Sequence, residues 1–272
     1  MLTARTETDF GAVNMAFSSQ SSHFDEDDFA NDILQEWRMR IYKHVDALIL
    51  PESDILELNA GTGIDSVRFA QQGHRSHATD LSDGMVSKIR GKIDSLSLHD
   101  AMTCQQVSFD QLYRVKGSYN YVFSNFGGLN CIADLAEVTR HLPALLKPGA
   151  IVTFVIMPPF CPWELSWVLK GDFKQAFRRW RKNGVMAHLE GSWFRTHYHS
   201  LSAIKEAFGT SFTYLTSEGI GVVSPPPAAL SFVKSFPRIT RFLNKVDRVV
   251  GKWPIFQRWG DHIIVTFAFK GA

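Results

Sequence analysis

Residues 54–80 constrain the fold of this chain more than any other segment. Ile55, Leu56 and Leu58 form a short apolar run, typical of a buried parallel strand, and a tight turn with Gly61 and Gly63 follows. An amphipathic stretch and a second short strand come next, and that strand ends on Asp80. A strand, a glycine turn, a helix and a strand with a terminal acid make half of a nucleotide-binding sheet. The chain is therefore expected to be an α/β protein with a doubly wound, Rossmann-like sheet.

The charges around the glycine turn separate the possible nucleotides. Glu57 lies in the strand, Asp65 follows the turn, and Ser66 stands where a dinucleotide-binding turn has its third glycine. Two carboxylates would repel a pyrophosphate, whereas they favour a ligand that carries an ammonium group. The turn therefore predicts S-adenosylmethionine, a cationic nucleoside without phosphate, as the cofactor rather than a dinucleotide.

Three segments together resemble the class I S-adenosylmethionine-dependent methyltransferases. Residues 57–63 are similar to motif I of that family, with Asn59 in place of its first glycine. Residues 80–85, Asp-Leu-Ser-Asp-Gly-Met, look like the family's second-strand signature, and residues 145–150, Leu-Leu-Lys-Pro-Gly-Ala, look like the turn before its fifth strand. The resemblance implies a methyltransferase of the small-molecule, biosynthetic type. It also implies a seven-stranded sheet with an antiparallel last strand.

Hydrophobic periodicity and composition divide the chain into four parts. The predicted parts are an N-terminal arm and helix (1–50), a cofactor-binding core (51–157), a lid insertion (158–198), and the end of the core sheet with a second lid insertion (199–272, insertion about 224–260). The two insertions follow the fifth and sixth strands and are expected to be helical. Ligands bind outside the carboxyl ends of the strands in open α/β sheets, so the insertions are expected to cover an acceptor pocket.

The predicted cofactor site lies at the carboxyl ends of the first four strands. Glycine lets a ligand approach the backbone, and Asp80 can accept hydrogen bonds from both ribose hydroxyls. The remaining positions follow from the resemblance. The predicted cofactor-binding residues are Glu57, Asn59, Ala60, Gly61, Gly63, Asp80, Leu81, Met85, Ser108, Phe109, Asn125 and Phe126.

The predicted acceptor site is aromatic, which favours a flat or apolar acceptor. Its predicted substrate contacts are Phe24, Gly127, Phe160 and Trp163. Phe24 precedes Asp25, a pair that resembles an aromatic–Asp pair in the N-terminal segment of related methyltransferases. Residues 10–30 are therefore predicted to become ordered on cofactor binding and to close the pocket together with the first lid insertion.

A hydroxyl acceptor needs a base near its proton, and histidine is the usual base at neutral pH. His197 and His199 alternate with Trp193 and Arg195, so they share one face if this segment is extended. They are the predicted catalytic residues. His262, which follows Asp261, is a weaker candidate.

The leading prediction is transfer of a methyl group to a hydroxyl of an aromatic or polyketide-like natural product. N- or C-methylation of a small molecule is the first alternative, since a free amine needs no strong base. A non-catalytic cofactor-binding or interaction protein is the second. The chain carries a net charge of −7 over residues 1–157 and +9 over residues 158–272, but no recognised RNA-binding module, which argues against a nucleic acid partner.

The sequence predicts neither a metal site nor a membrane span nor a signal peptide. The cysteines are far apart and lack zinc spacing, which predicts no metal. No run of 18 apolar residues is present, and the first 20 residues lack the apolar segment of a signal peptide. A cytoplasmic protein that acts on a small-molecule acceptor, without a membrane span, is therefore expected. The oligomeric state is left open.

Overall fold

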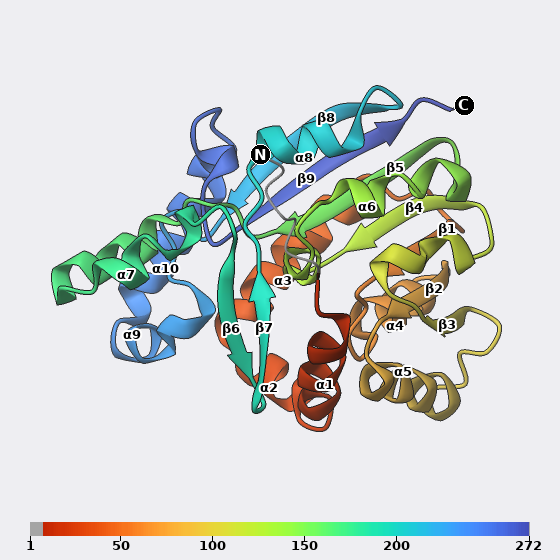
Figure 1. Ribbon diagram of the computed structural model, residues 1–272, viewed down its shortest axis with the longest axis horizontal. Helices are drawn as coiled ribbons and strands as arrows, with labels where there is room; N and C mark the ends of the chain where they lie inside the picture. The colour runs from red at the N-terminus through yellow and green to blue at the C-terminus, as the bar shows by residue number, and fades with distance from the viewer. Residues whose placement is uncertain (1–7, 272) are drawn as a thin grey trace, which may run out of the picture.

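The computed structural model describes residues 8–271 (Figure 1). In this part of the chain a seven-stranded sheet has the order β3-β2-β1-β4-β5-β9-β8. The strands are β1 (Asp54–Leu58), β2 (Arg75–Asp80), β3 (Met102–Gln106), β4 (Tyr119–Ser124), β5 (Leu146–Ile156), β8 (Phe212–Ile220) and β9 (His262–Phe269). Strands β1 to β5 pair in parallel, whereas β9 runs antiparallel between β5 and β8. The predicted seven-stranded, Rossmann-like sheet with an antiparallel last strand is confirmed.

Alternation along the strands builds a core on each face of the sheet. In β4, Val122 faces one cluster, which includes α8 (Leu201–Phe208). Tyr121 and Phe123 face the other, which includes α3 (Asp32–Asp46). Successive side chains of a strand point to opposite faces, so both faces must be covered by helices. The helices α4 (Ile64–Gln71), α5 (Asp83–Ser95) and α6 (Ala136–Thr139) complete the two layers around the parallel strands (Figure 1).

Two predicted helices are interrupted in the structure. The helix predicted over residues 27–50 divides at Asn31, whose Oδ1 accepts the N–H groups of Ile33 and Leu34 and so begins α3. The preceding α2 spans Phe24–Ala30. Residues 132–146 contain two short helices, α6 and the 3-10 helix Leu142–Leu145, because Pro143 has no N–H for the interior of a helix and instead lies in the first turn of the second one.

The N-terminal segment and the first insertion also differ from the prediction. Residues 10–20, expected in a mobile arm, form α1 (Phe10–Gln20), while residues 1–7 of that arm lie outside the described residues. The first insertion contains η4 (Pro162–Lys170) and α7 (Phe173–Ala176), then a hairpin of β6 (Val185–Leu189) and β7 (Ser192–Thr196). The prediction that the first insertion is wholly helical was therefore wrong.

The hairpin turn explains why it was not predicted. Glu190 and Gly191 both have positive φ, 47° and 79°, as the two central residues of a type I′ turn require. Asparagine or aspartate is usual at the first of these positions, and glutamate gives no such sequence signal. The second insertion consists of α9 (Leu230–Ser235) and α10 (Pro237–Val250), with flanking turns.

Candidate active site

A cavity of about 250 Å³ opens at the carboxyl ends of the central strands, between the sheet, α1 and the β6–β7 hairpin. Its wall is mostly apolar, with a few polar groups at the end formed by β1 and β2. Ten of the residues predicted for the cofactor and the acceptor line it together: Asn59, Gly61, Asp80, Leu81, Met85, Phe109, Asn125, Phe126, Phe24 and Gly127. One cavity thus contains both predicted sites.

Asp80 and Gly61 form the polar end of the cavity. The carboxylate of Asp80 accepts the backbone N–H of Gly61 at 2.8 Å and that of Ser82 at 2.8 Å. Burial raises the pKa of Asp80 to about 6, although these N–H groups favour the charged form. A carboxylate has about four lone-pair sites, so two backbone donors leave acceptor capacity for a ligand in the cavity.

Asn59 joins the β1 turn to the β4 turn. Its backbone φ is +46°, a left-handed conformation that asparagine tolerates better than most residues. Its Nδ2 donates to the carbonyl oxygen of Asn125 at 3.0 Å, and its Oδ1 accepts the Ser124 hydroxyl at 2.5 Å. A Cβ added at Gly128 would lie 2.4 Å from Asn59 Cγ. The asparagine that departs from the family pattern therefore requires glycine at position 128.

We expect Gly128→Ala to lower the free energy of unfolding by about 1–3 kcal/mol, because the new methyl group overlaps the Asn59 side chain. Urea unfolding measures this loss. The double substitution Asn59→Gly/Gly128→Ala should recover most of it. Gly91→Ala in α5 is the matched control, since nothing lies within 4 Å of its added Cβ. If Gly128→Ala is as stable as Gly91→Ala, the proposed overlap is wrong.

The two acids that flank the glycine turn are buried beneath the cavity. Glu57 accepts the hydroxyl of Ser66, and burial together with the nearby Asp65 raises its pKa well above the usual range. Asp65 accepts Arg38 Nη1 at 2.5 Å and Asn125 Nδ2 at 2.7 Å. The network therefore fixes Asn125 at the cavity wall.

Phe126 and Gly127 follow Asn125 and have φ of +45° and +74°. Positive φ is unusual for a bulky residue such as phenylalanine and persists only where its surroundings hold it. Phe126 donates its N–H to Asn125 Oδ1 at 2.9 Å, and the Arg38 guanidinium lies 4.8 Å from the centre of its ring. The left-handed turn that forms this wall is therefore fixed by contacts from α3 and β4.

The helix α1 closes the apolar end of the cavity. Phe10, Val13 and Phe17 lie on one face of it and line the cavity. The ring of Phe17 is 5.6 Å from that of Phe194 in β7, so the N-terminal helix and the hairpin meet over the cavity. Phe24 approaches the position of a Cβ on Gly61 to 3.7 Å. The ordering of residues 10–30 on cofactor binding stays a prediction.

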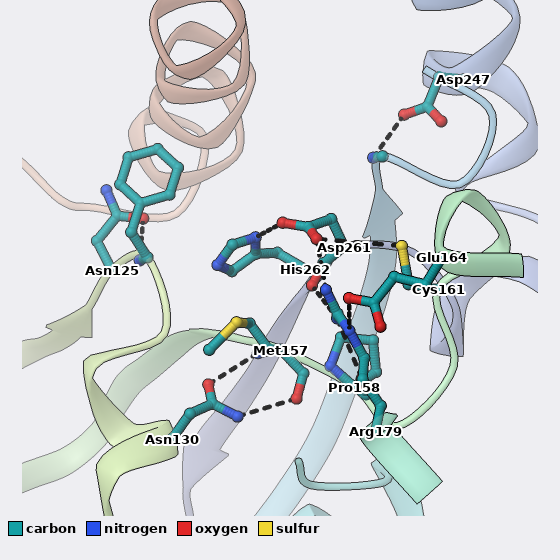
Figure 2. Close-up of polar contacts among 12 residues, drawn as sticks. Asn125, Asn130, Met157, Pro158, Cys161, Glu164, Arg179, Asp247, Asp261 and His262 are labelled. Atoms are coloured by element: carbon teal, nitrogen blue, oxygen red, sulfur yellow. Dashed lines mark hydrogen bonds and ion pairs between the residues drawn. The ribbon is translucent and has the colours of Figure 1, made fainter. Parts of the chain in front are cut away.

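His262, at the start of β9, lies beside Gly127. Figure 2 shows its ring next to Asp261. Its Nδ1 is 2.9 Å from Asp261 Oδ2. A Cβ added at Gly127 would be 3.3 Å from its Nε2 and 3.2 Å from Met157 Cε, and both Gly127 and Met157 line the cavity. The contact of Nδ1 with Asp261 has the distance of an ion pair but not the alignment of a hydrogen bond, and among residues 8–271 Nε2 forms no hydrogen bond either. One nitrogen is therefore paired with a carboxylate, and the other is directed to the cavity wall.

Arg179 and Glu164 of the first insertion hold Asp261 in place (Figure 2). Arg179 is buried, and its Nη2 donates to Asp261 Oδ1 at 2.5 Å while its Nε donates to Glu164 Oε1 at 2.7 Å. Burial of Asp261 opposes ionisation, but Arg179 and His262 hold the pKa of Asp261 well below its usual range. The ring of His262 meets the edges of Trp37 and Phe126, each at 5.9 Å between centroids. These contacts fix its orientation.

The predicted bases His197 and His199 lie elsewhere. His199 Nε2 donates to the carbonyl oxygen of Ile132 at 3.0 Å, and burial lowers the pKa of His199 to about 4. His199 lines a separate hollow beside α6 and α8. Burial also lowers the pKa of His197, whose backbone N–H donates to Asn130 at 2.7 Å. Neither imidazole is among the described residues that line the cavity.

The other predicted residues outside the described lining are Glu57, Ala60, Gly63, Ser108, Phe160 and Trp163. Gly63 packs against α5, since a Cβ there would meet Ile89 at 3.1 Å. Phe160 and Trp163 contact Trp259 and Phe232, at 4.7 and 5.6 Å between ring centroids. These two aromatic residues therefore join the first insertion to the second.

Sequence reasoning did not include several residues that line the cavity. They are Phe10, Val13, Phe17, Thr79, Val107, Leu112, Gly128, Cys131, Met157, Phe194 and Thr196. The three from α1 recur at helical spacing within a polar stretch, a signal that could have identified a helix there. The others are apolar or small residues whose spacing is equally compatible with the core.

Comparisons with known proteins agree with this geometry. Residues 55–149 match the family described as "Methyltransferase domain". The chain is similar to demethylmenaquinone methyltransferase from Beutenbergia cavernae, at 30% identity over 158 residues. The match covers 55% of this chain and 60% of that relative, so the chain spans less than two thirds of the relative's length.

Solved structures share the fold. Magnesium protoporphyrin IX methyltransferase from Synechocystis, with bound S-adenosylhomocysteine, aligns with a TM-score of 0.60 at 15% identity, over 96% of this chain and 99% of that one. An S-adenosylmethionine-dependent methyltransferase from Mesorhizobium loti aligns with a TM-score of 0.53 at 15% identity, over 84% of this chain and 96% of that one. Residues 55–149 therefore match a methyltransferase domain, and the chain shares the fold of these S-adenosylmethionine-dependent methyltransferases.

Proposed function

We propose that this protein transfers a methyl group from S-adenosylmethionine to a flat, lipophilic small molecule, with a hydroxyl of an aromatic or quinone-like ring as the acceptor. One observation carries the proposal: a single cavity joins the Asp80 carboxylate to a chamber walled by Phe10, Val13, Phe17 and Phe194. The polar end suits an adenosine, and the apolar end suits an acceptor without charge. The quinone class is suggested by the name of the similar demethylmenaquinone methyltransferase.

The residues at the polar end fit the cofactor. Gly61 has no side chain and a φ of +57°, and Asp80 has lone pairs left for the ribose hydroxyls. Leu81, Met85 and Phe109 supply apolar walls for the adenine. When bound, S-adenosylmethionine supplies a methyl group on a positively charged sulfur. Asn125 and Phe126 would lie near its methionine portion, held by the Asp65 network.

His262 is the base of this proposal. His262 is not itself among the described lining residues, but its Nε2 lies 3.3 Å from the position of a Cβ on Gly127, which does line the cavity. Nε2 would accept the proton of an acceptor hydroxyl held beside Gly127. Asp261 would stabilise the imidazolium that forms, and Arg179 would keep Asp261 ionised. His199 is less suitable, since a base with a pKa of about 4 is weak at neutral pH.

An assay of product formation tests the proposed function. The protein is incubated with methyl-labelled S-adenosylmethionine and either reduced naphthoquinones or water-soluble amines of similar size. We expect labelled methyl ethers from the lipophilic hydroxyl compounds, whereas label on a ring carbon would favour C-methylation. Product from the amines alone would contradict the proposal and favour N-methylation, which needs no strong base.

Cofactor affinity should depend on pH through Asp80. The pKa of Asp80 is about 6 in the free protein, and ribose hydroxyls donate to its charged form, so its pKa must fall on binding. The affinity for the cofactor should therefore be highest well above pH 6 and should decrease below it, by up to about tenfold per pH unit. Calorimetry between pH 5 and 8 measures this dependence. Asp80→Asn should remove it, and an equal dependence in that variant would contradict the assignment.

A further inference from the structure

The helix α10 exposes a row of apolar side chains to solvent. Ile239, Phe242 and Val249 are 49%, 65% and 58% exposed, and Trp253, just after the helix, is 53% exposed. Val246 completes the spacing of three and four residues that places side chains on one face of a helix. Large apolar side chains on a soluble surface are ordinary when they are scattered, but a contiguous row marks an interaction site.

A row of basic side chains runs beside the apolar row. Arg238, Arg241, Lys245, Arg248 and Lys252 each precede one residue of the apolar row. Arg238, Arg241 and Lys245 form no ion pair with any residue in the described range 8–271, whereas Arg248 pairs with the half-buried Glu36 and Lys252 with Glu218. Four of these basic residues line a shallow hollow of about 460 Å³. The helix therefore presents unneutralised positive charge next to its apolar row.

The third face of α10 is anchored to the protein. Asp247 is buried, and it accepts Arg40 Nη1 at 2.6 Å and the backbone N–H of Val223 at 2.7 Å. Thr240 is buried on the same face. The apolar and basic rows therefore face outward from a fixed helix. Figure 1 shows α10 at the end of the molecule where α7 and α9 also lie.

We propose that the outer face of α10 docks the protein on an anionic lipid bilayer. Aromatic and aliphatic side chains beside a row of lysine and arginine are typical of helices that lie in the membrane interface, where anionic headgroups attract the basic groups. No helix within residues 8–271 is long and apolar enough to cross a membrane, so the contact would be peripheral. The inference goes beyond the proposed function, although a lipophilic acceptor would also be found in the bilayer.

Vesicle flotation tests this inference with the full chain. Vesicles of phosphatidylcholine with about 30 mol% phosphatidylglycerol should bind the protein about tenfold or more tightly than phosphatidylcholine alone, and high salt should weaken the binding. Phe242→Ser/Val249→Ser and Arg241→Gln/Lys245→Gln should each weaken binding to the anionic vesicles about tenfold. Tyr113→Ser/Lys116→Gln, a matched exposed pair in the segment between β3 and β4, should leave it unchanged.

Two results would overturn the inference. One is equal binding to anionic and neutral vesicles, or none to either. The other concerns the Phe242→Ser/Val249→Ser variant. If this variant keeps both its vesicle binding and a salt-sensitive binding to polyglutamate, the surface recognises anionic partners in general rather than lipid. Calorimetry with S-adenosylmethionine on the same variants separates this test from the proposed function. No residue of α10 is in the described cavity lining, so the affinity for the cofactor should be unchanged.

Discussion

Replacing His262 with glutamine should lower turnover by about 10²–10⁴-fold, the usual contribution of a positioned general base. Glutamine preserves much of the side-chain volume between Trp37 and Phe126 but cannot accept a proton at neutral pH. Because His262 lies beside Gly127 and not at Asp80, the affinity for S-adenosylmethionine should change little. Single-turnover kinetics and calorimetry on the same preparation measure the two quantities.

The variants of the neighbouring residues distinguish a base from a structural residue. Asp261→Asn should reduce turnover less than His262→Gln, since Asp261 positions the imidazole and does not itself accept the proton. His199→Gln should retain turnover, because His199 lines a separate hollow. Full activity of His262→Gln, or a greater loss in His199→Gln, would contradict the assignment.

Replacing Asp80 with alanine should weaken S-adenosylmethionine binding by about 1–3 kcal/mol, the range for losing hydrogen bonds to a charged group. That change corresponds to an affinity lower by about 5- to 150-fold. The substitution also removes the acceptor for the Gly61 and Ser82 N–H groups, so the glycine turn loses a fixed partner. Calorimetry measures the affinity, and urea unfolding separates it from any loss of stability.

Asp100→Ala is the matched control for Asp80→Ala, because Asp100 is an exposed carboxylate outside the cavity lining that the described residues form. Its affinity for the cofactor should equal that of the unaltered protein. Equal affinities for all three proteins would contradict the ribose contact.

The sequence predicts the cofactor end of the site because its determinants are local. A strand, the turn with Gly61 and Gly63, and Asp80 lie within one short segment, and their order alone brings Asp80 to the Gly61 N–H. The role of Glu57 could not be read in the same way. The residue type and position are those of a cofactor contact, but burial and the Ser66 hydroxyl direct it beneath the cavity.

The acceptor end depends on contacts between distant parts of the chain. Phe17 contacts Phe194, and His262 lies beside Gly127. The residues of each pair are too far apart in the sequence for a local pattern to predict the contact. His197 and His199 were predicted as bases from alternation in an extended segment, yet β7 ends at Thr196. His199 lines the hollow beside α6 and α8, whereas His197 Nδ1 lies 3.0 Å from the position of a Cβ on Gly184. The contact between Asn59 and Gly128 likewise could not be predicted from the sequence. The sequence shows that Asn59 departs from the family pattern, but not that Gly128 makes room for it.

The central claim is that the cavity at the carboxyl ends of the central strands binds S-adenosylmethionine beside an apolar acceptor chamber. Isothermal titration calorimetry of the purified chain with S-adenosylmethionine, repeated after Phe17→Asp is introduced, tests it most directly. We expect one site per chain with a dissociation constant of about 1–100 μM, a binding free energy of about −8 to −5 kcal/mol. Phe17→Asp should retain that binding but lose turnover on lipophilic acceptors. No binding by the unaltered, folded chain would contradict the claim.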